Sequence, residues 1–161
     1  MNDCFCIENY VSNNNPEHHI DLNYKDEGQK EVYEFCKYFM KNNNLNTIID
    51  IGCGSGYKLI NILNEFNTIG IETEPCYTYL KINYPDRKWL LSGEIKNSDV
   101  VICCDVIEHI VNPDILVDYL ISLNSKYYII STPCREILCN HPKFKIDYGV
   151  TVMDFQIINV M

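Results

Sequence analysis

The sequence has no alanine, no long apolar run and few basic residues, and two of these absences exclude whole classes of protein. Thirteen lysines and arginines stand against 22 aspartates and glutamates, which gives a formal net charge of -9. Sequence-independent affinity for nucleic acid comes from basic side chains that neutralise phosphates, so nucleic acid is not expected as a partner. No apolar run approaches the ~20 residues that cross a bilayer, so no membrane partner is expected either. The lack of alanine indicates a coding bias rather than chemistry.

Paired C-x-x-C spacings are also missing, although the chain has nine cysteines. Zinc knuckles use such pairs, so a zinc framework is not predicted and no metal site is assigned. The N-terminus MNDCFCIENY is acidic and lacks the basic segment and apolar core of a secretory signal. We therefore expect free thiols in a reducing compartment, and a cytoplasmic protein.

The 161 residues suit one domain, preceded by a polar arm at residues 1–25. Within residues 26–161, apolar spacing predicts a first helix from Asp26 to Lys41. Short β-branched runs then alternate with helical stretches. The expected strands are 47–51, 68–72, 88–92, 98–104 and 127–131, and the expected helices are 57–66, 77–83 and 115–123. Strands that are apolar on both faces and separated by helices predict a three-layer α/β/α sandwich with a Rossmann-like, mostly parallel sheet.

A glycine-rich turn follows the first predicted strand, in the stretch IIDIGCGSG. Asp50, Gly52, Gly54 and Gly56 form D-x-G-x-G-x-G, which is tighter than the dinucleotide fingerprint because Tyr57 stands where that pattern has its last glycine. Glycine is needed where the backbone takes a positive φ or passes close to a ligand. The turn alone is equally consistent with a simple strand-to-helix connection.

Glu72 ends the second predicted strand, 22 residues after Asp50. An acid at that place can accept both hydroxyl groups of an adenosine ribose, and the alternative is a solvated strand end. The glycine turn and Glu72 together, in one β-α-β frame, predict a nucleotide-like ligand.

Residues 26–133 resemble class I S-adenosylmethionine-dependent methyltransferases, and more narrowly the small domains of types 11 and 12. The resemblance rests on IIDIGCGSG, on GIE ending at Glu72, on SDVVICCDVIEHI at 98–110 and on YYIISTP at 127–133. It implies S-adenosylmethionine as cofactor, with the backbone of Gly52, Cys53, Gly54 and Gly56 along its methionine and ribose. It also implies that Asp50 organises the turn, that Glu72 holds the ribose and that Ser92, Gly93 and Glu94 lie along the adenine.

The segment after the fourth predicted strand carries the candidate catalytic residues. Cys104 and Asp105 are expected to line the cofactor pocket, and Asp105 is also a catalytic candidate. His109 is the candidate base, because an imidazole titrates near neutrality. The same letters resemble the segment with which small-RNA 2′-O-methyltransferases hold a divalent metal, and a metal-assisted RNA enzyme using Asp105, Glu108, His109 and His141 is kept as an alternative.

The resemblance implies transfer of a methyl group to an oxygen or nitrogen of a small-molecule or carbohydrate-like acceptor. After Pro133 the usual fold continues with a helix and an antiparallel hairpin, and only GVTV and FQIINV could supply that hairpin. One alternative is therefore a fold that lacks part of this hairpin. A degenerate cofactor-binding protein without turnover is a further alternative. The oligomeric state is not predicted.

Overall fold

A computed structural model describes residues 29–94, 96–110, 112–133 and 153–159. The arm predicted at 1–25, the GVTV segment and His141 lie outside the described residues. In chain order the elements are α1 (Gln29–Asn42), β1 (Thr47–Ile51), α2 (Tyr57–Asn61), β2 (Asn67–Glu72), α3 (Cys76–Asn83), β3 (Lys88–Leu91), β4 (Val100–Cys104), the 3₁₀ helix η3 (Ile107–His109), α4 (Pro113–Ser122), β5 (Tyr127–Pro133) and β6 (Met153–Asn159).

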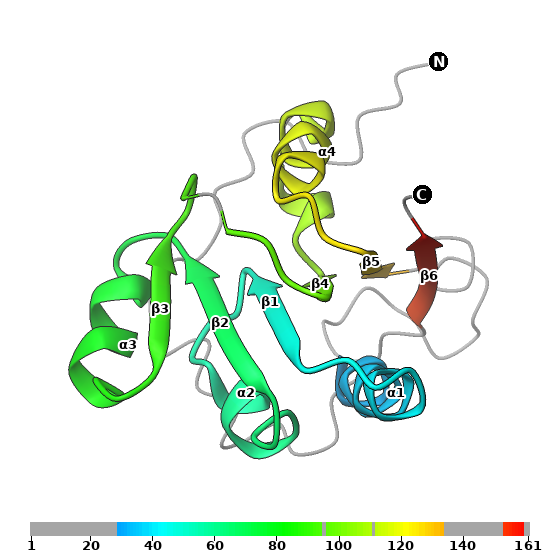
Figure 1. Ribbon diagram of the computed structural model, residues 1–161. Helices are drawn as coiled ribbons and strands as arrows, with labels where there is room; N and C mark the ends of the chain where they lie inside the picture. Colours follow the sequence, from blue (N-terminus) through cyan, green and yellow to red (C-terminus); the bar gives the residue numbers. More distant parts are fainter. Residues whose placement is uncertain (1–28, 95, 111, 134–152, 160–161) are drawn as a thin grey trace, which may run out of the picture.

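The strands form one sheet in the order β3-β2-β1-β4-β5-β6 (Figure 1). The first five strands are parallel, and β6 runs antiparallel to β5. Asp50 on β1 lies between Gly70 on β2 and Ile102 on β4. The chain winds outward from β1 to β3 and then returns to the other side of β1 with β4. The ends of β1 and β4 therefore form the switch point at which ligands bind in open α/β sheets.

Helices cover both faces of the sheet, as the α/β/α prediction requires (Figure 1). The face under α1, α2 and α3 is a core that includes Met40, Ile48, Leu59, Leu63, Leu80, Trp89, Val100 and Ile102. The face under α4 is a second core that includes Ile49, Ile51, Ile71, Val101, Cys103, Leu116, Leu120 and Leu123. Successive residues of β4 alternate between these two cores, which is why the strand reads as an uninterrupted apolar run. The predicted fold class is confirmed.

One predicted helix is wrong in length. The stretch 57–66 was expected to be helical throughout, but α2 ends at Asn61. The Asn61 side-chain amide donates to the carbonyl of Tyr57 at 2.8 Å, and such a bond competes with the backbone helix ladder. Turns follow, and they still bury Ile62 and Leu63.

The C-terminal region contains a sixth strand. β6 pairs with β5 from Tyr127 opposite Asn159 to Pro133 opposite Met153. The segment FQIINV, offered as a remnant of the hairpin, therefore contributes to a strand that covers the outer edge of β5. No helix among the described residues is long and apolar enough to cross a membrane. The five described cysteines, at 36, 53, 76, 103 and 104, are free thiols.

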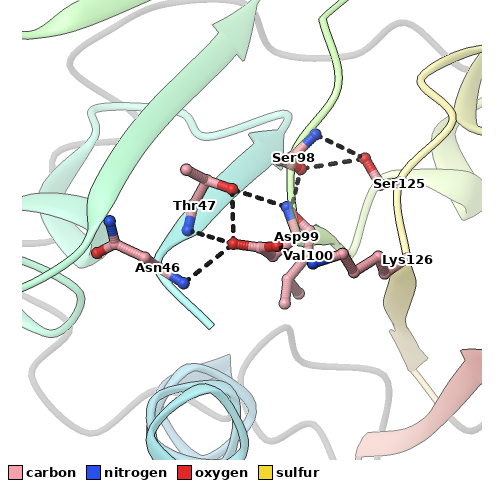
Figure 2. Close-up of polar contacts among 7 residues, drawn as sticks. All are labelled: Asn46, Thr47, Ser98, Asp99, Val100, Ser125 and Lys126. Atoms are coloured by element: carbon pink, nitrogen blue, oxygen red, sulfur yellow. Dashed lines mark hydrogen bonds and ion pairs between the residues drawn. The ribbon is translucent and has the colours of Figure 1, made fainter. Parts of the chain in front are cut away.

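The edge of the sheet where β1 and β4 begin is joined by Asp99, the residue before β4 (Figure 2). Asp99 Oδ2 accepts hydrogen bonds from the backbone N–H groups of Asn46 and Thr47, both at 3.0 Å, and from the Thr47 hydroxyl at 2.9 Å. Its Oδ1 accepts from Lys126 Nζ at 2.7 Å. The Lys126 ammonium, with these backbone donors, holds the pKa of Asp99 well below its usual range. Asp99 therefore joins the starts of β1, β4 and β5 through polar contacts at the amino edge of the sheet.

Candidate functional site

The residues with chemical potential lie at the opposite, carboxyl edge of the sheet. β1 leads there into the glycine turn, β2 ends at Glu72, and β4 leads into Asp105. An open depression on the amino edge is lined by Asp86 and Arg87 among others, and it contains none of these residues. The carboxyl edge is therefore the candidate site.

The glycine turn needs its glycines for the turn itself. Gly52, Gly54 and Gly56 have φ values of 73°, 56° and 73°, in the left-handed region that side chains disfavour. A Cβ on Gly52 would lie 2.4 Å from Val106 in the loop after β4, and one on Gly56 would lie 2.7 Å from the Trp89 ring. The absent side chains thus let the loops of β1 and β4 touch. Positive φ is one of the two reasons that sequence analysis offered for these glycines, and the structure shows it at all three.

Glu72 is held against the glycine turn. Its Oε2 accepts a hydrogen bond from the Gly54 N–H at 2.8 Å, and its Oε1 accepts from the Thr73 N–H at 2.8 Å. The structure thus brings Glu72 into contact with the glycine turn, the two features that together predicted a nucleotide-like ligand. The carboxylate is at the surface of the site, at the end of β2, where hydroxyl groups of a ligand could reach it.

The predicted adenine segment forms a turn outside β3. β3 ends at Leu91, so Ser92 follows the strand instead of ending it. The Ser92 N–H donates to the Glu72 carbonyl at 2.9 Å, which ties the turn to the end of β2. Gly93 has a φ of 97°, and a Cβ there would meet nothing within 4 Å. Glu94 Oε1 accepts from the Leu91 N–H at 2.8 Å, so this carboxylate closes its own turn.

Asp50 lies on β1, two residues before Gly52, and has 1% of its surface exposed. Its Oδ2 accepts a hydrogen bond at 2.8 Å from the hydroxyl of Tyr33 on α1. The Lys58 ammonium, on α2, lies 5.6 Å from the centre of the Tyr33 ring. Burial and the Asp50 carboxylate raise the pKa of Tyr33, so its hydroxyl stays protonated and remains a donor.

Asp105 follows β4 with a φ of 54°. Its backbone N–H donates to the Ser131 carbonyl at 3.0 Å, and its Oδ2 accepts from Gln29 Nε2 at 2.9 Å. Its Oδ1 is buried and has no hydrogen-bond partner among the described residues. Burial raises the pKa of Asp105 to about 6, and Glu108 adds to that rise. The Gln29 hydrogen bond, His109 and Lys58 act in the opposite direction.

η3 carries the remaining candidates. Glu108 Oε2 accepts from the Thr132 hydroxyl at 3.3 Å, and burial raises the pKa of Glu108. His109 Nε2 lies 3.9 Å from Glu108 Oε1, which is an ion pair only when the imidazole is protonated. The His109 side chain is 40% exposed, so it can meet a solute at the mouth of the site.

The Cys104 side chain belongs to the core under α1, α2 and α3, and the Cys53 side chain packs against the same core. Burial, and then the charge of Asp50, raises the pKa of both thiols. Thiolates would be needed for nucleophilic attack, so these cysteines act as small apolar side chains.

No group of three or more histidine, cysteine, aspartate or glutamate side chains among the described residues could hold a metal ion. His141, the fourth ligand of the metal alternative, lies outside the described residues. The alternative gains no support from the geometry, because one oxygen of Asp105 is already bonded to Gln29.

Known proteins resemble this chain in structure rather than in sequence. No family model matches the sequence, and no curated protein matches it. A solved S-adenosylmethionine-dependent methyltransferase from Clostridium acetobutylicum ATCC 824 superposes with a TM-score of 0.59 at 17% identity, covering 77% of this chain and 58% of that one. The chain has a class I methyltransferase fold.

Two further structures with this methyltransferase fold show the same range of similarity. The plantazolicin methyltransferase BpumL, in complex with a pentazolic desmethylPZN analog and SAH, gives a TM-score of 0.56 at 20% identity over 76% of this chain and 54% of that chain. The methyltransferase domain of bacterial CtHen1-CN gives 0.58 at 20% identity over 70% of each chain. The chain thus spans little more than half the length of two of the three proteins with which it shares the fold.

The residues that sequence analysis missed lie on α1 and α2. Gln29, Tyr33 and Lys58 all reach the site, but none belongs to a motif. A signal for two of them exists, because Gln29 and Tyr33 occupy the same helix face as the buried Cys36 and Met40. Polar groups on an apolar helix face need a buried partner, and here the partners are the two aspartates.

Proposed function

We propose that the protein is an S-adenosylmethionine-dependent methyltransferase that acts on an oxygen or nitrogen of a small-molecule or carbohydrate-like acceptor in the cytoplasm. The observation that carries the proposal is the contact between Gly54 and Glu72 at the switch point of a methyltransferase fold. A bound sulfonium cofactor would supply an electrophilic methyl group there.

The residues present fit such a cofactor. The turn from Gly52 to Gly56 exposes backbone rather than side chains, and the Glu72 carboxylate has the acceptor chemistry that two ribose hydroxyls require. Asp105 Oδ1 is a buried acceptor with no hydrogen-bond partner among the described residues, and a cationic group would satisfy it. We assign Cys53, Cys104 and the turn from Ser92 to Glu94 to the same pocket.

The chain's own contribution to the reaction is alignment and, where needed, a base. Holding two reactants in line can supply about 7 to 11 kcal/mol of the barrier, so no strong acid or base is required for a neutral nitrogen acceptor. A hydroxyl acceptor must lose its proton, and His109 at the mouth of the site is the group we propose to take it. Asp105, a further catalytic candidate, would face the methionine end.

The first test is binding of S-adenosylhomocysteine by calorimetry. We expect saturable binding, and Glu72→Ala should weaken it by about 1 to 3 kcal/mol, because the ligand hydroxyls would lose their acceptor. Glu34→Ala, at an exposed position on α1, is the matched control and should bind as wild type does. The absence of both heat and a melting shift with millimolar ligand would refute the cofactor assignment.

Turnover separates an enzyme from a degenerate cofactor-binding protein. The protein is incubated with S-adenosylmethionine and a metabolite extract, and methylated products are sought by mass spectrometry. New products that depend on S-adenosylmethionine support the enzyme, and their loss in His109→Ala would support His109 as the base for a hydroxyl acceptor. Binding without any product favours the degenerate protein instead.

A further inference from the structure

Helix α1 brings two polar side chains to the carboxyl edge of the sheet. Gln29 and Tyr33 are four residues apart, so they lie on one face of the helix. Gln29 Nε2 donates to Asp105 at 2.9 Å, and the Tyr33 hydroxyl donates to Asp50 at 2.8 Å. The two acceptors belong to different strands, since Asp50 lies in β1 and Asp105 follows β4.

We propose that Gln29 and Tyr33 are positioning residues, which orient the carboxylates of Asp105 and Asp50 for the cofactor. The inference rests on the proposed function and adds α1 to the site. Neither residue needs to touch the cofactor or the acceptor for this role.

The geometry gives each donor a distinct effect. Asp50 is buried on β1, two residues before Gly52, and the Tyr33 hydroxyl restrains one of its oxygens from the helix side. The same Tyr33 ring faces the Lys58 ammonium, so the side chain is held at both its ring and its hydroxyl. A tyrosine fixed in this way has little freedom to follow a displaced carboxylate. Tyr33 therefore fixes the position of one oxygen of the buried Asp50 carboxylate.

Gln29 acts on a carboxylate that is otherwise unfavourable to bury. The groups that face Asp105 are Gln29 from α1, Glu108 and His109 from η3, and Lys58 from α2. Of these groups, Gln29 donates a hydrogen bond to the Asp105 carboxylate at 2.9 Å. It favours the charged form, so its loss should raise the pKa of Asp105 above about 6.

A merely structural role for Gln29 would not move a pH profile, which makes the profile the decisive measurement. If the cofactor binds with Asp105 ionised, its affinity falls as Asp105 takes up a proton. Removing the Gln29 amide should shift that fall to higher pH. Removing the Tyr33 hydroxyl should weaken binding across the whole range, because Asp50 is displaced at every pH.

The experiment measures the affinity for S-adenosylhomocysteine by calorimetry from about pH 5.5 to about pH 8.5, a range that brackets the titration of Asp105. Wild type is compared with Gln29→Leu, Tyr33→Phe and Tyr38→Phe. Tyr38 is 65% exposed on the same helix, so Tyr38→Phe makes the same chemical change outside the site. We expect about tenfold weaker binding near pH 6.5 for Gln29→Leu and at all pH values for Tyr33→Phe, the usual scale for one lost hydrogen bond to a charged group.

The possible outcomes distinguish failure of the proposed function from failure of the positioning role. Wild-type protein that binds no S-adenosylhomocysteine overturns the proposed function and the positioning role together. Wild-type binding that Gln29→Leu and Tyr33→Phe leave unchanged, with the same pH profile, overturns the positioning role alone. If circular dichroism shows that Tyr33→Phe does not fold, the pH midpoint of Gln29→Leu decides, because Gln29 is the first residue of α1 and only half-buried.

Discussion

Strand β4 has an aspartate at each end, and the two carboxyl groups have opposite environments. Asp99, before the strand, accepts two backbone N–H groups, a hydroxyl and an ammonium (Figure 2). Asp105, after the strand, has one hydrogen bond to Gln29 and one buried oxygen without a hydrogen-bond partner among the described residues. The pKa of Asp99 is lowered and that of Asp105 is raised to about 6.

This contrast distinguishes the amino edge, where a carboxylate joins two strands, from the carboxyl edge, which is the proposed binding edge. At the amino edge, Asp99 joins the start of β1 to the start of β4, and its charge is fully used within the protein. At the carboxyl edge, Asp105 accepts one hydrogen bond from Gln29, and its other oxygen is buried without a hydrogen-bond partner among the described residues. Buried carboxylates with few hydrogen-bond partners or opposite charges are common at functional sites, because a bound ligand can provide the missing partner.

The largest expected effect is on Asp99. Asp99→Ala should lower the free energy of unfolding by about 2 to 3 kcal/mol, because the N–H groups of Asn46 and Thr47 lose a charged acceptor. Urea denaturation measures this change, with the exposed Asp86→Ala as the matched control. Affinity for S-adenosylhomocysteine should stay as in wild type, and a loss of affinity comparable to that of Glu72→Ala would show that the two edges are not independent.

An intermediate effect of opposite sign is expected at Asp105. Between about pH 4 and about pH 6 the folded protein keeps a proton on Asp105 that the unfolded chain has released, so the free energy of unfolding falls as pH rises through this window. Asp105→Asn removes that contribution and keeps a residue that tolerates the left-handed backbone. We expect a gain of about 1 to 2 kcal/mol at pH 7, smaller than the full pKa shift would give.

The measurement for Asp105→Asn is urea denaturation at several pH values, expressed as variant minus wild type. Asp118→Asn, at an exposed position on α4, controls for the change of charge. A difference that stays flat from pH 4 to pH 7 would mean that Asp105 titrates at its ordinary pKa in the folded protein.

The smallest effect is expected for Lys126→Met. Lys126 provides the largest single contribution to the low pKa of Asp99, so the variant should move that pKa up toward its ordinary value of 3.8. A lowered pKa stabilises the fold above the unfolded value and loses that stabilisation as pH falls through the folded value. The variant should therefore be slightly less stable than wild type at neutral pH, because an exposed ion pair contributes little, and this difference should fade as pH falls below about 3.8. An unchanged acid titration would assign the shift of Asp99 to the backbone donors.

Much of the fold could be predicted because its signals are local. The apolar runs of β1, β2, β4 and β5 and the spacing of α1 follow from which side chains each element must bury. The length of α2 could not be predicted, since it ends where the Asn61 side chain takes a backbone carbonyl. Whether FQIINV forms a strand depended on its pairing with β5, which a local sequence pattern does not encode.

The candidate site divides in the same way. The sequence by itself determined the glycine turn and Glu72, because only glycine readily adopts the positive φ of that turn and because both follow strands of one parallel sheet. It also determined that Asp105 and His109 would follow the fourth strand. Only the tertiary structure decided that Gln29 and Tyr33 meet Asp105 and Asp50, across 76 and 17 residues of chain respectively. It also decided that Asp99 and Asp105 differ, because the pKa of a carboxyl depends on burial and on neighbours that arrive from other elements.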